Sequence, residues 1–385
     1  MKQKICVVTG SRADYGLLRP VLQELRAASD LKVQLIATGM HLSPEFGLTF
    51  REIEADGFVI DRKVDMLLSS DSRSAIGKSI GLGTIGFADA LQDLSPDLLL
   101  LLGDRFEIFS AAVAALIACI PVAHLHGGET TEGAFDEAIR HSITKMSHLH
   151  FVAAEQYRQR VIRMGEQPDR VFNVGGLGVD NISQIKLLGR TELERTLGVS
   201  FLEKSLLVTF HPVTLEPASC AHQLEELLAA LAPLTNTTLL FTMPNADTDG
   251  RRLFRMLEAF TANRQNAHIF ISMGAKRYLS CMKWVDGLVG NSSSGLAEAP
   301  SFRIGSVNIG DRQRGRLKAP SVIDCEPERE QIKAAIKRLY SSEFRVLLQQ
   351  VANPYGEGGA SRKIVETIRA CSMKGILKKS FYDCP

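Results

Sequence analysis

The sequence predicts an α/β fold made of two doubly wound domains, each built around a parallel sheet. Short apolar runs alternate with segments of helical periodicity up to residue 176, and the same alternation resumes after residue 200. Several runs, such as LLLLL at 98–102, are apolar throughout, which is typical of strands buried on both faces of a parallel sheet. A chain of 385 residues is also too long for one typical core, so two domains are expected.

In the first half, each predicted strand is an apolar run that ends near glycine or polar residues. The predicted strands are 4–10, 31–39, 97–103, 121–127, 148–154 and 170–176. The predicted helices are 19–29, 74–94, 109–119, 136–147 and 155–165. This alternation favours parallel strands joined by crossover helices.

The second half repeats the pattern. Its predicted strands are 206–212, 238–244, 268–273, 286–292 and 304–310. Its predicted helices are 221–234, 249–262, a short 293–300, and the helical signals at 328–351 and 360–371. We therefore expect a first domain at 1–178, a second at 179–360, and a C-terminal segment at 361–385 that packs back on the first.

Composition and charge exclude several classes of protein. A net charge of +2 without a Lys/Arg run argues against a nucleic-acid partner. The longest apolar stretch, 111–123, contains Pro121 and is shorter than the about 20 residues that span a bilayer, so no membrane partner is expected. The first residues read as a strand rather than a signal peptide, and the seven cysteines include no C-x-x-C pair. We expect a cytoplasmic protein with reduced thiols.

Acids, imidazoles and arginines gather between residues 103 and 141, directly after two of the apolar runs. Open α/β sheets place their active sites at such strand ends, and these side chains suit proton transfer. The candidate catalytic residues are Asp104, His126, Glu129 and Asp136, and the neighbouring candidate substrate-binding residues are Arg105 and Arg140. Asp136 and Arg140 share a helix face, so a plain surface ion pair is the alternative.

Two histidines, His124 and His126, lie two residues apart on one predicted strand and therefore share a face. We expect His124 to be a structural histidine that is hydrogen-bonded in the core. Two histidines together with Asp104 would also suit a metal ion, but the nearby arginines compete for the acids, so no metal site is expected.

Two glycine-containing turns, one in each half, have the form of phosphate-binding loops. TGSRADYG at 9–16 joins a strand to a helix and carries Arg12; its alternative is an ordinary turn with a solvated arginine. GNSSSGLAEAP at 290–300 offers hydroxyls and backbone N–H groups before a helix, and three hydroxyls exceed the needs of an N-cap. The residues expected to bind phosphate or ribose there are Ser292, Ser293, Ser294, Gly295 and Glu298. Neither turn is a G-x-G-x-x-G motif, so no dinucleotide cofactor is expected.

Two further segments are candidates for the nucleotide side of the site. His211 ends a predicted strand, where it could stabilise phosphate charge. The basic loop GDRQRGRLKAP at 310–320 either approaches a nucleotide through Arg312, Arg314 and Arg316 or is a solvated loop.

Taken in order, these motifs resemble the hydrolysing UDP-N-acetylglucosamine 2-epimerase family of sialic-acid-type sugar synthesis. The resemblance rests on TGSRADYG, ATGMHL, GDRFEIFSAAVAAL, HLHGGE, IRHSITKMSHLH, FHPVT, NADT, GNSSSGL and NIGDRQRGR. It implies a GT-B-like fold with the active site in the cleft between two Rossmann-like domains, and a homodimer. It also implies conversion of UDP-GlcNAc and water to ManNAc and UDP through a 2-acetamidoglucal, with no metal or other cofactor. A related branch acts on UDP-N,N'-diacetylbacillosamine; a non-hydrolysing 2-epimerase, a GT-B glycosyltransferase and an inactive sugar-nucleotide sensor are further alternatives.

The resemblance also implies roles for individual residues. Asp104 and Asp136 match catalytic acids of the family. His126 stands where many relatives carry glutamate, so either His126 or Glu129 takes that proton-transfer role. The positions that match nucleotide-binding residues are Arg12, His211, Ser292, Ser293, Ser294 and Glu298, with Tyr278 where relatives place an aromatic ring near the uracil.

Overall fold

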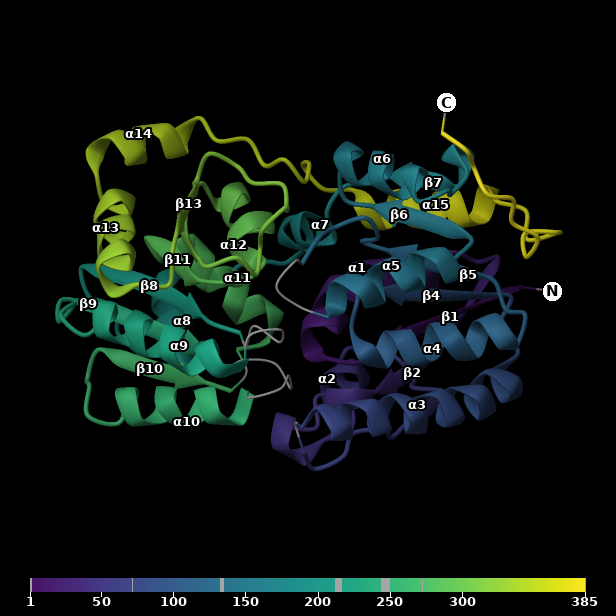
Figure 1. Cartoon of the computed structure of the whole chain (residues 1–385), viewed down its shortest axis with the longest axis horizontal. Helices are drawn as coiled ribbons and strands as arrows, with labels where there is room; N and C mark the ends of the chain where they lie inside the picture. Colours follow the sequence, from purple (N-terminus) through teal and green to yellow (C-terminus); the bar gives the residue numbers. More distant parts are fainter. Residues whose placement is uncertain are drawn as a thin grey trace. The chain divides into compact units, whose positions relative to one another are not determined.

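The computed structural model describes residues 2–70, 72–131, 135–211, 217–243, 250–271 and 273–384. The chain divides into two compact units (Figure 1). Unit 1 comprises Met1–Glu129, Asp136–Gln184 and Tyr355–Pro385, and unit 2 comprises Thr130–Phe135 and Ile185–Pro354. The chain passes between the units at Glu129, Asp136, Gln184 and Tyr355, and the sequence placed its divisions at 178 and 360.

Unit 1 is built on a parallel sheet with the strand order β3-β2-β1-β4-β5-β6-β7. Its strands are β1 Gln3–Thr9, β2 Leu31–Thr38, β3 Arg62–Val64, β4 Leu98–Leu102, β5 Val122–Leu125, β6 Leu149–Val152 and β7 Val171–Asn173. Its α-helices are α1 Arg12–Ala27, α2 Phe50–Ala55, α3 Arg73–Leu94, α4 Phe106–Ile117, α5 Asp136–Met146, α6 Glu155–Arg163, α7 Leu177–Gln184 and α15 Ala360–Ala370.

Both faces of this sheet are covered. Ile5 and Val7 of β1 belong to one buried cluster, whereas Cys6 and Val8 belong to another. Alternate residues of a strand point to opposite faces, so each face has its own apolar core. The LLLLL run of β4 is divided between the same two clusters. This explains why the central strands are apolar throughout, as the sequence predicted.

Unit 2 contains a second parallel sheet, with the order β10-β9-β8-β11-β12-β13. Its strands are β8 Lys204–Thr209, β9 Thr237–Thr242, β10 Ala267–Phe270, β11 Gly287–Gly290, β12 Gly305–Ile309 and β13 Val322–Cys325. Its α-helices are α8 Arg190–Leu197, α9 Pro217–Leu231, α10 Gly250–Thr261, α11 Gly274–Trp284, α12 Ser294–Ala297, α13 Arg329–Leu339 and α14 Ser342–Gln349. The prediction of two α/β domains with doubly wound parallel sheets is confirmed.

Some element boundaries differ from the prediction. Helix α1 begins at Arg12 rather than 19, because Ser11 caps it by accepting a hydrogen bond from the Asp14 amide, 3.3 Å, and Pro20 is accommodated inside the helix. The expected helix 293–300 is one α-turn, α12, followed by the 3₁₀ turn Ala299–Phe302. The sequence did not predict α11.

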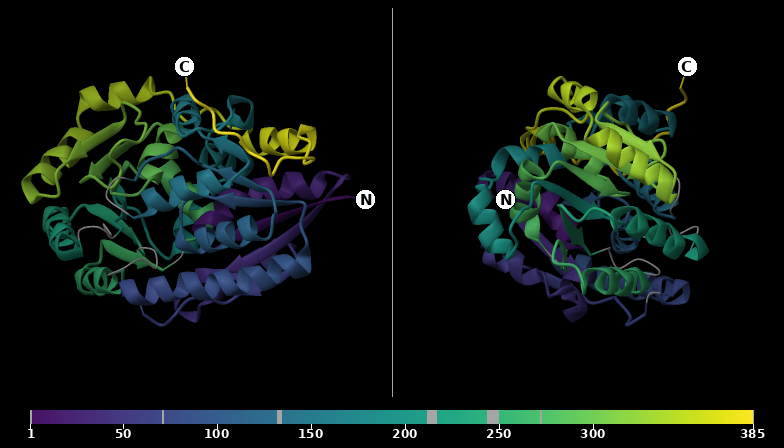
Figure 2. Two further views of the ribbon diagram at one scale, coloured as in Figure 1. Left: turned by 45° about the vertical axis from the view of Figure 1, so that its right-hand side comes forward. Right: turned by 90° about the vertical axis from the view of Figure 1, so that its left-hand side faces the viewer.

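The last helix, α15, belongs to unit 1, where it packs against α1 and α7 (Figure 2). The carboxylate of Asp180, on α7, accepts hydrogen bonds from the backbone amides of Gly359, 2.6 Å, and Ser361, 2.8 Å. A buried acceptor is thereby matched to the free N–H groups at the start of α15. The C-terminal segment packs on the first unit in this way.

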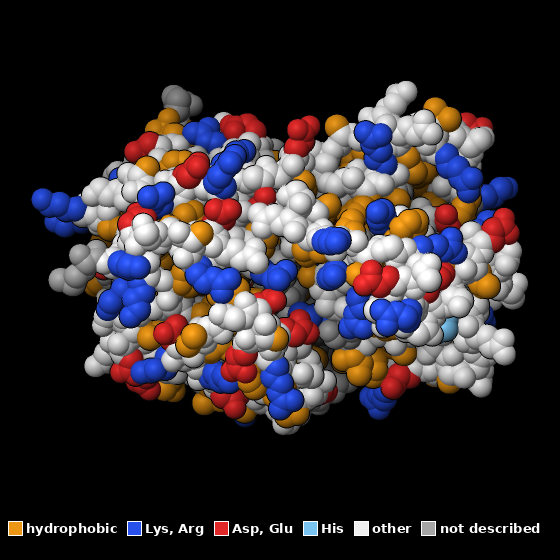
Figure 3. All heavy atoms as spheres, turned by 180° about the vertical axis from the view of Figure 1, so that it is seen from behind, with side chains coloured by type: hydrophobic (Ala, Val, Ile, Leu, Met, Phe, Trp, Pro, Cys, Tyr) orange, Lys and Arg blue, Asp and Glu red, His pale blue; other side chains and the backbone are white. Residues whose placement is uncertain are grey.

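Charges are mixed over the surface. On the face shown in Figure 3, Lys and Arg side chains are interspersed with Asp and Glu side chains, in keeping with the net charge of +2. Within the ranges that the structure describes, no helix is both long enough and apolar enough to cross a membrane.

Candidate active site

The candidate residues lie where the strand order reverses in each sheet. In unit 1 the reversal falls between β1 and β4, and the following turns carry Arg12 and Asp104. In unit 2 it falls between β8 and β11, and the following turns carry His211 and Ser292. Open α/β sheets bind ligands at the carboxyl ends of the strands at such switch points. Each unit therefore has its own candidate ligand-binding site.

A buried arginine holds Asp104 in unit 1. Arg140 projects from α5, its side chain is 2% exposed, and its Nη2 contacts the Asp104 carboxylate. Its Nη1 donates to the Glu129 carbonyl, 2.9 Å, and to Oε2 of Glu137, 3.1 Å. Asp104 remains 22% exposed, so its carboxylate is oriented while still open to a ligand. Arg140 is too deeply buried for a surface ion pair, and it orients Asp104.

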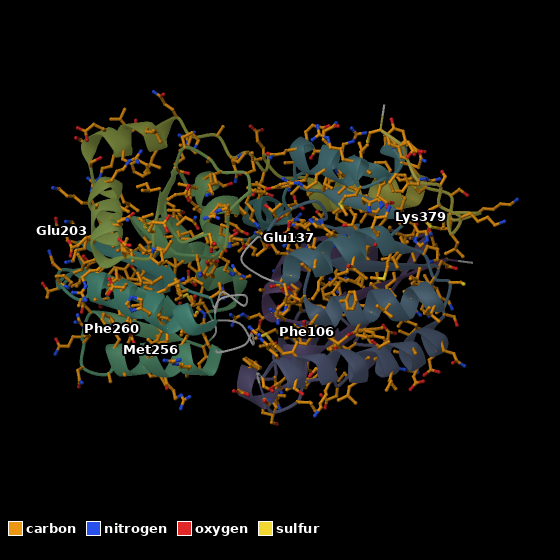
Figure 4. All side chains as sticks on the ribbon, viewed as in Figure 1. Phe106, Glu137, Glu203, Met256, Phe260 and Lys379 are labelled. Carbon is orange, nitrogen blue, oxygen red and sulfur yellow. The ribbon has the colours of Figure 1, made fainter. Side chains whose placement is uncertain are left out.

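Glu137 is a member of this group that the sequence analysis missed. It lies in the first turn of α5 (Figure 4) and accepts from Nε2 of His141, 3.1 Å, as well as from Arg140. Its spacing to Arg140 and His141, three and four residues along a helix, is the signal that would have revealed it.

His126 supports Glu129. Nδ1 of His126 is 3.0 Å from Oε1 of Glu129, and the backbone amide of Leu177 donates to Nε2, 3.3 Å. An amide can only donate, so Nε2 accepts and the imidazole proton lies on Nδ1, which donates to Glu129. Both ring nitrogens of His126 are thus committed, and the Glu129 carboxylate has a fixed donor. His126 has a positive φ of 63°, so the turn after β5 is tightly defined.

His124 is a core histidine, as expected. It is fully buried, with Nε2 2.7 Å from the Gly103 carbonyl and Nδ1 3.1 Å from Oγ1 of Thr144. Burial lowers the pKa of His124 to about 3, so the ring is neutral. With both nitrogens committed it is unavailable to a metal ion, and its bond to Gly103 anchors the turn that carries Asp104.

The two glycines after His126 are required by close packing. A Cβ on Gly127 would lie 3.0 Å from Nδ1 of His124, and a Cβ on Gly128, whose φ is 77°, would lie 2.6 Å from the Tyr157 carbonyl. Glu129 therefore follows two positions, Gly127 and Gly128, at which the surrounding atoms leave no room for a side chain.

Arg105 is paired with a buried acid that the sequence analysis left unassigned. Its Nε and Nη2 donate to Oε2 and Oε1 of Glu107, 3.2 and 3.3 Å, and its side chain is 11% exposed. Glu107 is fully buried against Gly10 and Gly39, where a Cβ on Gly39 would lie 2.9 Å from it. Burial raises the pKa of Glu107, and the guanidinium of Arg105 opposes that rise. The pair fixes the turn beside Arg12, the first residue of α1.

A second missed residue, His41, belongs to the ATGMHL motif. It is buried between Oγ1 of Thr9, 2.9 Å, and Oγ1 of Thr49, 2.8 Å. Burial lowers its pKa to about 4. It joins the end of β1 to the segment that follows β2.

In unit 2 the turns after β8 and β11 are fastened together. Gly290 has a φ of 137°, and a Cβ there would lie 1.9 Å from the Thr209 carbonyl, so only glycine fits. The side chain of Asn291 accepts from the His211 amide, 2.7 Å, and donates to the His211 carbonyl, 2.9 Å. This amide bridge sets the position of His211 beside the serine turn.

The hydroxyl of the N-cap residue is not used for capping. Ser293 is the N-cap residue of α12, and its side chain makes no capping hydrogen bond. Ser292 accepts from the Ser294 amide at 3.4 Å. Gly295 and Glu298 follow in and directly after the same short helix. The absence of side-chain capping at Ser293 favours the phosphate-binding interpretation over the N-cap alternative.

Tyr278 of α11 reaches the same turn. Burial raises its pKa to about 12, and the neighbouring hydroxyls of Ser294, Thr209 and Ser292 oppose that rise. Family resemblance placed an aromatic ring here near the uracil, and the hydroxyl of that ring has the serines as neighbours. A fourth hydroxyl therefore joins the candidate phosphate site.

The comparisons with known proteins agree with this picture. The model of the UDP-N-acetylglucosamine 2-epimerase family matches residues 23–369. The chain is 42% identical to a GDP/UDP-N,N'-diacetylbacillosamine 2-epimerase (hydrolyzing) of Campylobacter jejuni, over 99% of both chains. It is 40% identical to polysialic acid biosynthesis protein P7 of Escherichia coli, over 100% of this chain and 98% of that protein.

The fold is GT-B-like. It matches the crystal structure of a Neisseria meningitidis UDP-GlcNAc 2-epimerase bound to UDP-GlcNAc with a TM-score of 0.82 and 19% identity, covering 96% of this chain and 100% of that one. The family match spans most of the chain, and the sequence relatives align along nearly their whole lengths. The chain belongs to the UDP-N-acetylglucosamine 2-epimerase family.

Proposed function

We propose that this protein is a hydrolysing UDP-N-acetylglucosamine 2-epimerase that converts UDP-GlcNAc and water to ManNAc and UDP. One observation carries the proposal: two carboxylates of unit 1, which follow β4 and β5, each have an orienting partner. Arg140 holds Asp104, and His126 holds Glu129. In a member of the 2-epimerase family, oriented carboxylates at this place are suited to moving the proton at C2 of the sugar.

The reaction begins with elimination of UDP. As the C1–O bond breaks, positive charge builds at C1 and the C2 proton becomes acidic. A carboxylate takes that proton, the C2–H electron pair forms the C1–C2 double bond, and UDP leaves with the C1–O pair. Water then adds its oxygen to C1 and a proton enters C2 from the opposite face. The products are UDP and the C2-inverted sugar.

On the sugar side, Asp104, Glu129 and Asp136 are the proposed proton carriers. The geometry of His126 supports Glu129 in the role that the sequence left between the two residues, because both imidazole nitrogens have partners within unit 1. His126 is then a positioning residue for Glu129.

On the nucleotide side, fixed positive charge and hydroxyl donors stabilise the departing UDP. Arg12 and His211 supply the charge or polar N–H groups, and Arg105, whose guanidinium is paired with Glu107, holds the turn beside Arg12. The proposed phosphate and ribose ligands of unit 2 are Tyr278, Ser292, Ser293, Ser294, Gly295 and Glu298. Tyr278 acts here through its hydroxyl.

UDP-N,N'-diacetylbacillosamine is the second candidate substrate, favoured by the 42% identity to the Campylobacter jejuni enzyme. The two sugars share the 2-acetamido group and the C2 proton, so the same carboxylates serve either reaction. Offering both UDP-sugars separately at equal concentration and comparing kcat/KM for UDP release decides between them. A kcat/KM at least about tenfold higher for the bacillosamine derivative would reverse the assignment.

The same assay separates the other classes of enzyme. The proposal predicts free sugar and UDP in equal amounts, without an added acceptor. UDP-ManNAc as the final product would indicate a non-hydrolysing 2-epimerase, and sugar transfer that requires an acceptor would indicate a glycosyltransferase. UDP-sugar binding without turnover would indicate a sensor.

We further propose a homodimer that acts in the cytoplasm. Neighbouring helices α3 and α4 expose apolar side chains: Ile85 is 66% exposed and Ile117 79%. A partner that covers them would remove apolar area from water. The cytoplasmic assignment is supported by seven cysteines that are all free thiols.

A further inference from the structure

The segment between two proposed proton carriers takes an unusual path. The chain leaves unit 1 after Glu129, and Thr130–Phe135 belongs to unit 2 before the chain re-enters unit 1 at Asp136. Whatever holds Thr130 and Thr131 therefore acts on the chain directly next to Glu129. Both threonines are buried, at 7% and 2% exposed.

Arg316 holds these two threonines. Its Nε donates to the Thr130 carbonyl, 2.6 Å, and its Nη2 donates to Oγ1 of Thr131, 3.1 Å. Thr130 in turn donates through Oγ1 to the Arg314 carbonyl, 3.2 Å. Hydrogen bonds from a charged group to buried acceptors are among the stronger polar interactions in proteins. The segment after Glu129 is thus fastened to the basic loop at 310–316.

The other part of the same loop holds the serine turn. Nη1 of Arg312, 3.1 Å, and Nε2 of Gln313, 2.8 Å, both donate to the carbonyl of Asn291, the residue before Ser292. Gln313 is fully buried and Asn291 is 1% exposed. Asn291 also carries the amide bridge to His211.

The loop between these contacts is compact. The Arg314 amide donates to the Asp311 carbonyl, 2.7 Å, and the Arg316 amide donates to the Gln313 carbonyl, 3.3 Å. Gly310 and Gly315 have positive φ values of 71° and 76°, which such tight turns need. The loop between the two sets of contacts is therefore held by its own backbone hydrogen bonds.

We infer that Arg316 is a positioning residue that links phosphate occupancy of the serine turn to the placement of Glu129. A phosphate bound at Ser292–Ser294 fixes the Asn291 backbone, the loop follows through Gln313, and Arg316 fixes Thr130, the residue bonded to Glu129. Glu129 is then in place when a UDP-sugar is bound. This inference rests on the proposed function for the role of Glu129.

The kinetic test replaces Arg316 by glutamine. Arg316→Gln is expected to lower kcat by about 10- to 100-fold, the scale of a misplaced catalytic group, while KM and the Kd for UDP stay within about twofold. Arg314→Gln is the matched control: its side chain is exposed and its contact to Thr130 is through the backbone, so its kcat should be that of wild type. An unchanged kcat in Arg316→Gln, or a weakened Kd for UDP with normal kcat, would overturn the inference.

A second variant guards against misfolding. Thr131→Val removes the acceptor for Nη2 of Arg316 but keeps the side-chain shape. Its loss in kcat should be less than additive with that of Arg316→Gln, because both break one contact. Fully additive losses would contradict the inference.

A binding experiment separates this inference from the proposed reaction. UDP added to wild-type protein should slow amide hydrogen exchange in peptides that include Thr130 and Thr131. In Arg316→Gln that slowing should be lost although UDP still binds. Slowing retained in the variant would refute the link, whereas failure of turnover alone would refute the proposed function.

Discussion

At the scale of single residues, the acids of unit 1 have orienting partners, of which some are distant in sequence and some are near. Asp104 and Arg140 are 36 residues apart and meet because α5 packs beside α4 and β5. The residue types in GDRFE and DEAIRH predicted an acid–arginine–imidazole group. The sequence could not assign the partners, since pairing depends on which side chain the buried guanidinium reaches. The sequence could not assign the partner of Arg105 either, because Glu107 is identified by its burial between two glycines.

Asp104 is the first test at this scale. Asp104→Asn keeps the shape and the contact with Arg140 but cannot accept a proton, so kcat should fall by about 10² to 10⁴-fold. The Kd for UDP, measured by calorimetry, should remain near the wild-type value because the nucleotide ligands are unchanged. Turnover close to wild type would remove Asp104 from the mechanism.

His126 provides the second test at the scale of single residues. Asparagine tolerates a positive φ and can donate a hydrogen bond to Glu129, so His126→Asn should keep kcat within about tenfold of wild type. His126→Ala, which lacks the donor, should lose about 100-fold, and Glu129→Gln should lose more. If His126→Asn is folded yet as inactive as Glu129→Gln, the imidazole itself carries the proton.

At the scale of elements, the sequence predicted those strands and helices whose buried residues follow a regular spacing. Strand β4 and residues 5–8 of β1 are apolar because both faces are covered, and these runs predicted the two strands well. Helix α11 was missed because its buried residues, 279–282, are consecutive and show no three- to four-residue spacing. Strand β3 was missed because only Val64 of its three residues is buried. Such elements form through tertiary contacts rather than local pattern.

The segment after α15 gives a pH prediction. Glu166 contacts Lys145, 2.6 Å, His150, 2.9 Å, and Lys379 of that segment, 2.7 Å (Figure 4 labels Lys379). Burial by itself raises the pKa of Glu166, but hydrogen bonds and charge from His150, Lys145 and Lys379 outweigh it and hold the pKa at about 2. Because this pKa is depressed, its stabilisation is present above about pH 4.5 and is lost as the pH falls toward 2.

The measurement is the melting temperature against pH. Glu166→Gln should melt several degrees below wild type at pH 6 to 7, and the two curves should converge between pH 4.5 and 2. Glu203→Gln, at an exposed site in unit 2, is the control and should leave the curve unchanged. A gap that stays constant down to pH 2 would show that Glu166 does not titrate as described.

At the scale of the whole molecule, the repeated α/β pattern predicted two parallel-sheet units, and each sheet has its candidate residues at its own switch point. What the pattern could not predict is that Thr130–Phe135 belongs to unit 2. That segment lies between two acids of the motif-rich first half, and its residues Thr130 and Thr131 contact Arg314 and Arg316.

The proposed homodimer is tested by light scattering after size exclusion. Ile85→Glu combined with Ile117→Glu should convert the protein to monomer, since two charges would enter the apolar contact. Val59→Glu, at a site that is 79% exposed outside α3 and α4, should leave the mass unchanged. A wild-type mass of one chain, or a double variant that stays dimeric, would contradict this interface.

The central claim is that oriented carboxylates exchange the C2 proton while UDP is eliminated and water is added. Reaction of UDP-GlcNAc in D₂O, followed by NMR, tests it most directly. The account predicts free ManNAc that carries deuterium at C2 in the inverted configuration, with one UDP released per sugar. Free GlcNAc with hydrogen retained at C2 would show simple hydrolysis at C1 and would contradict the account.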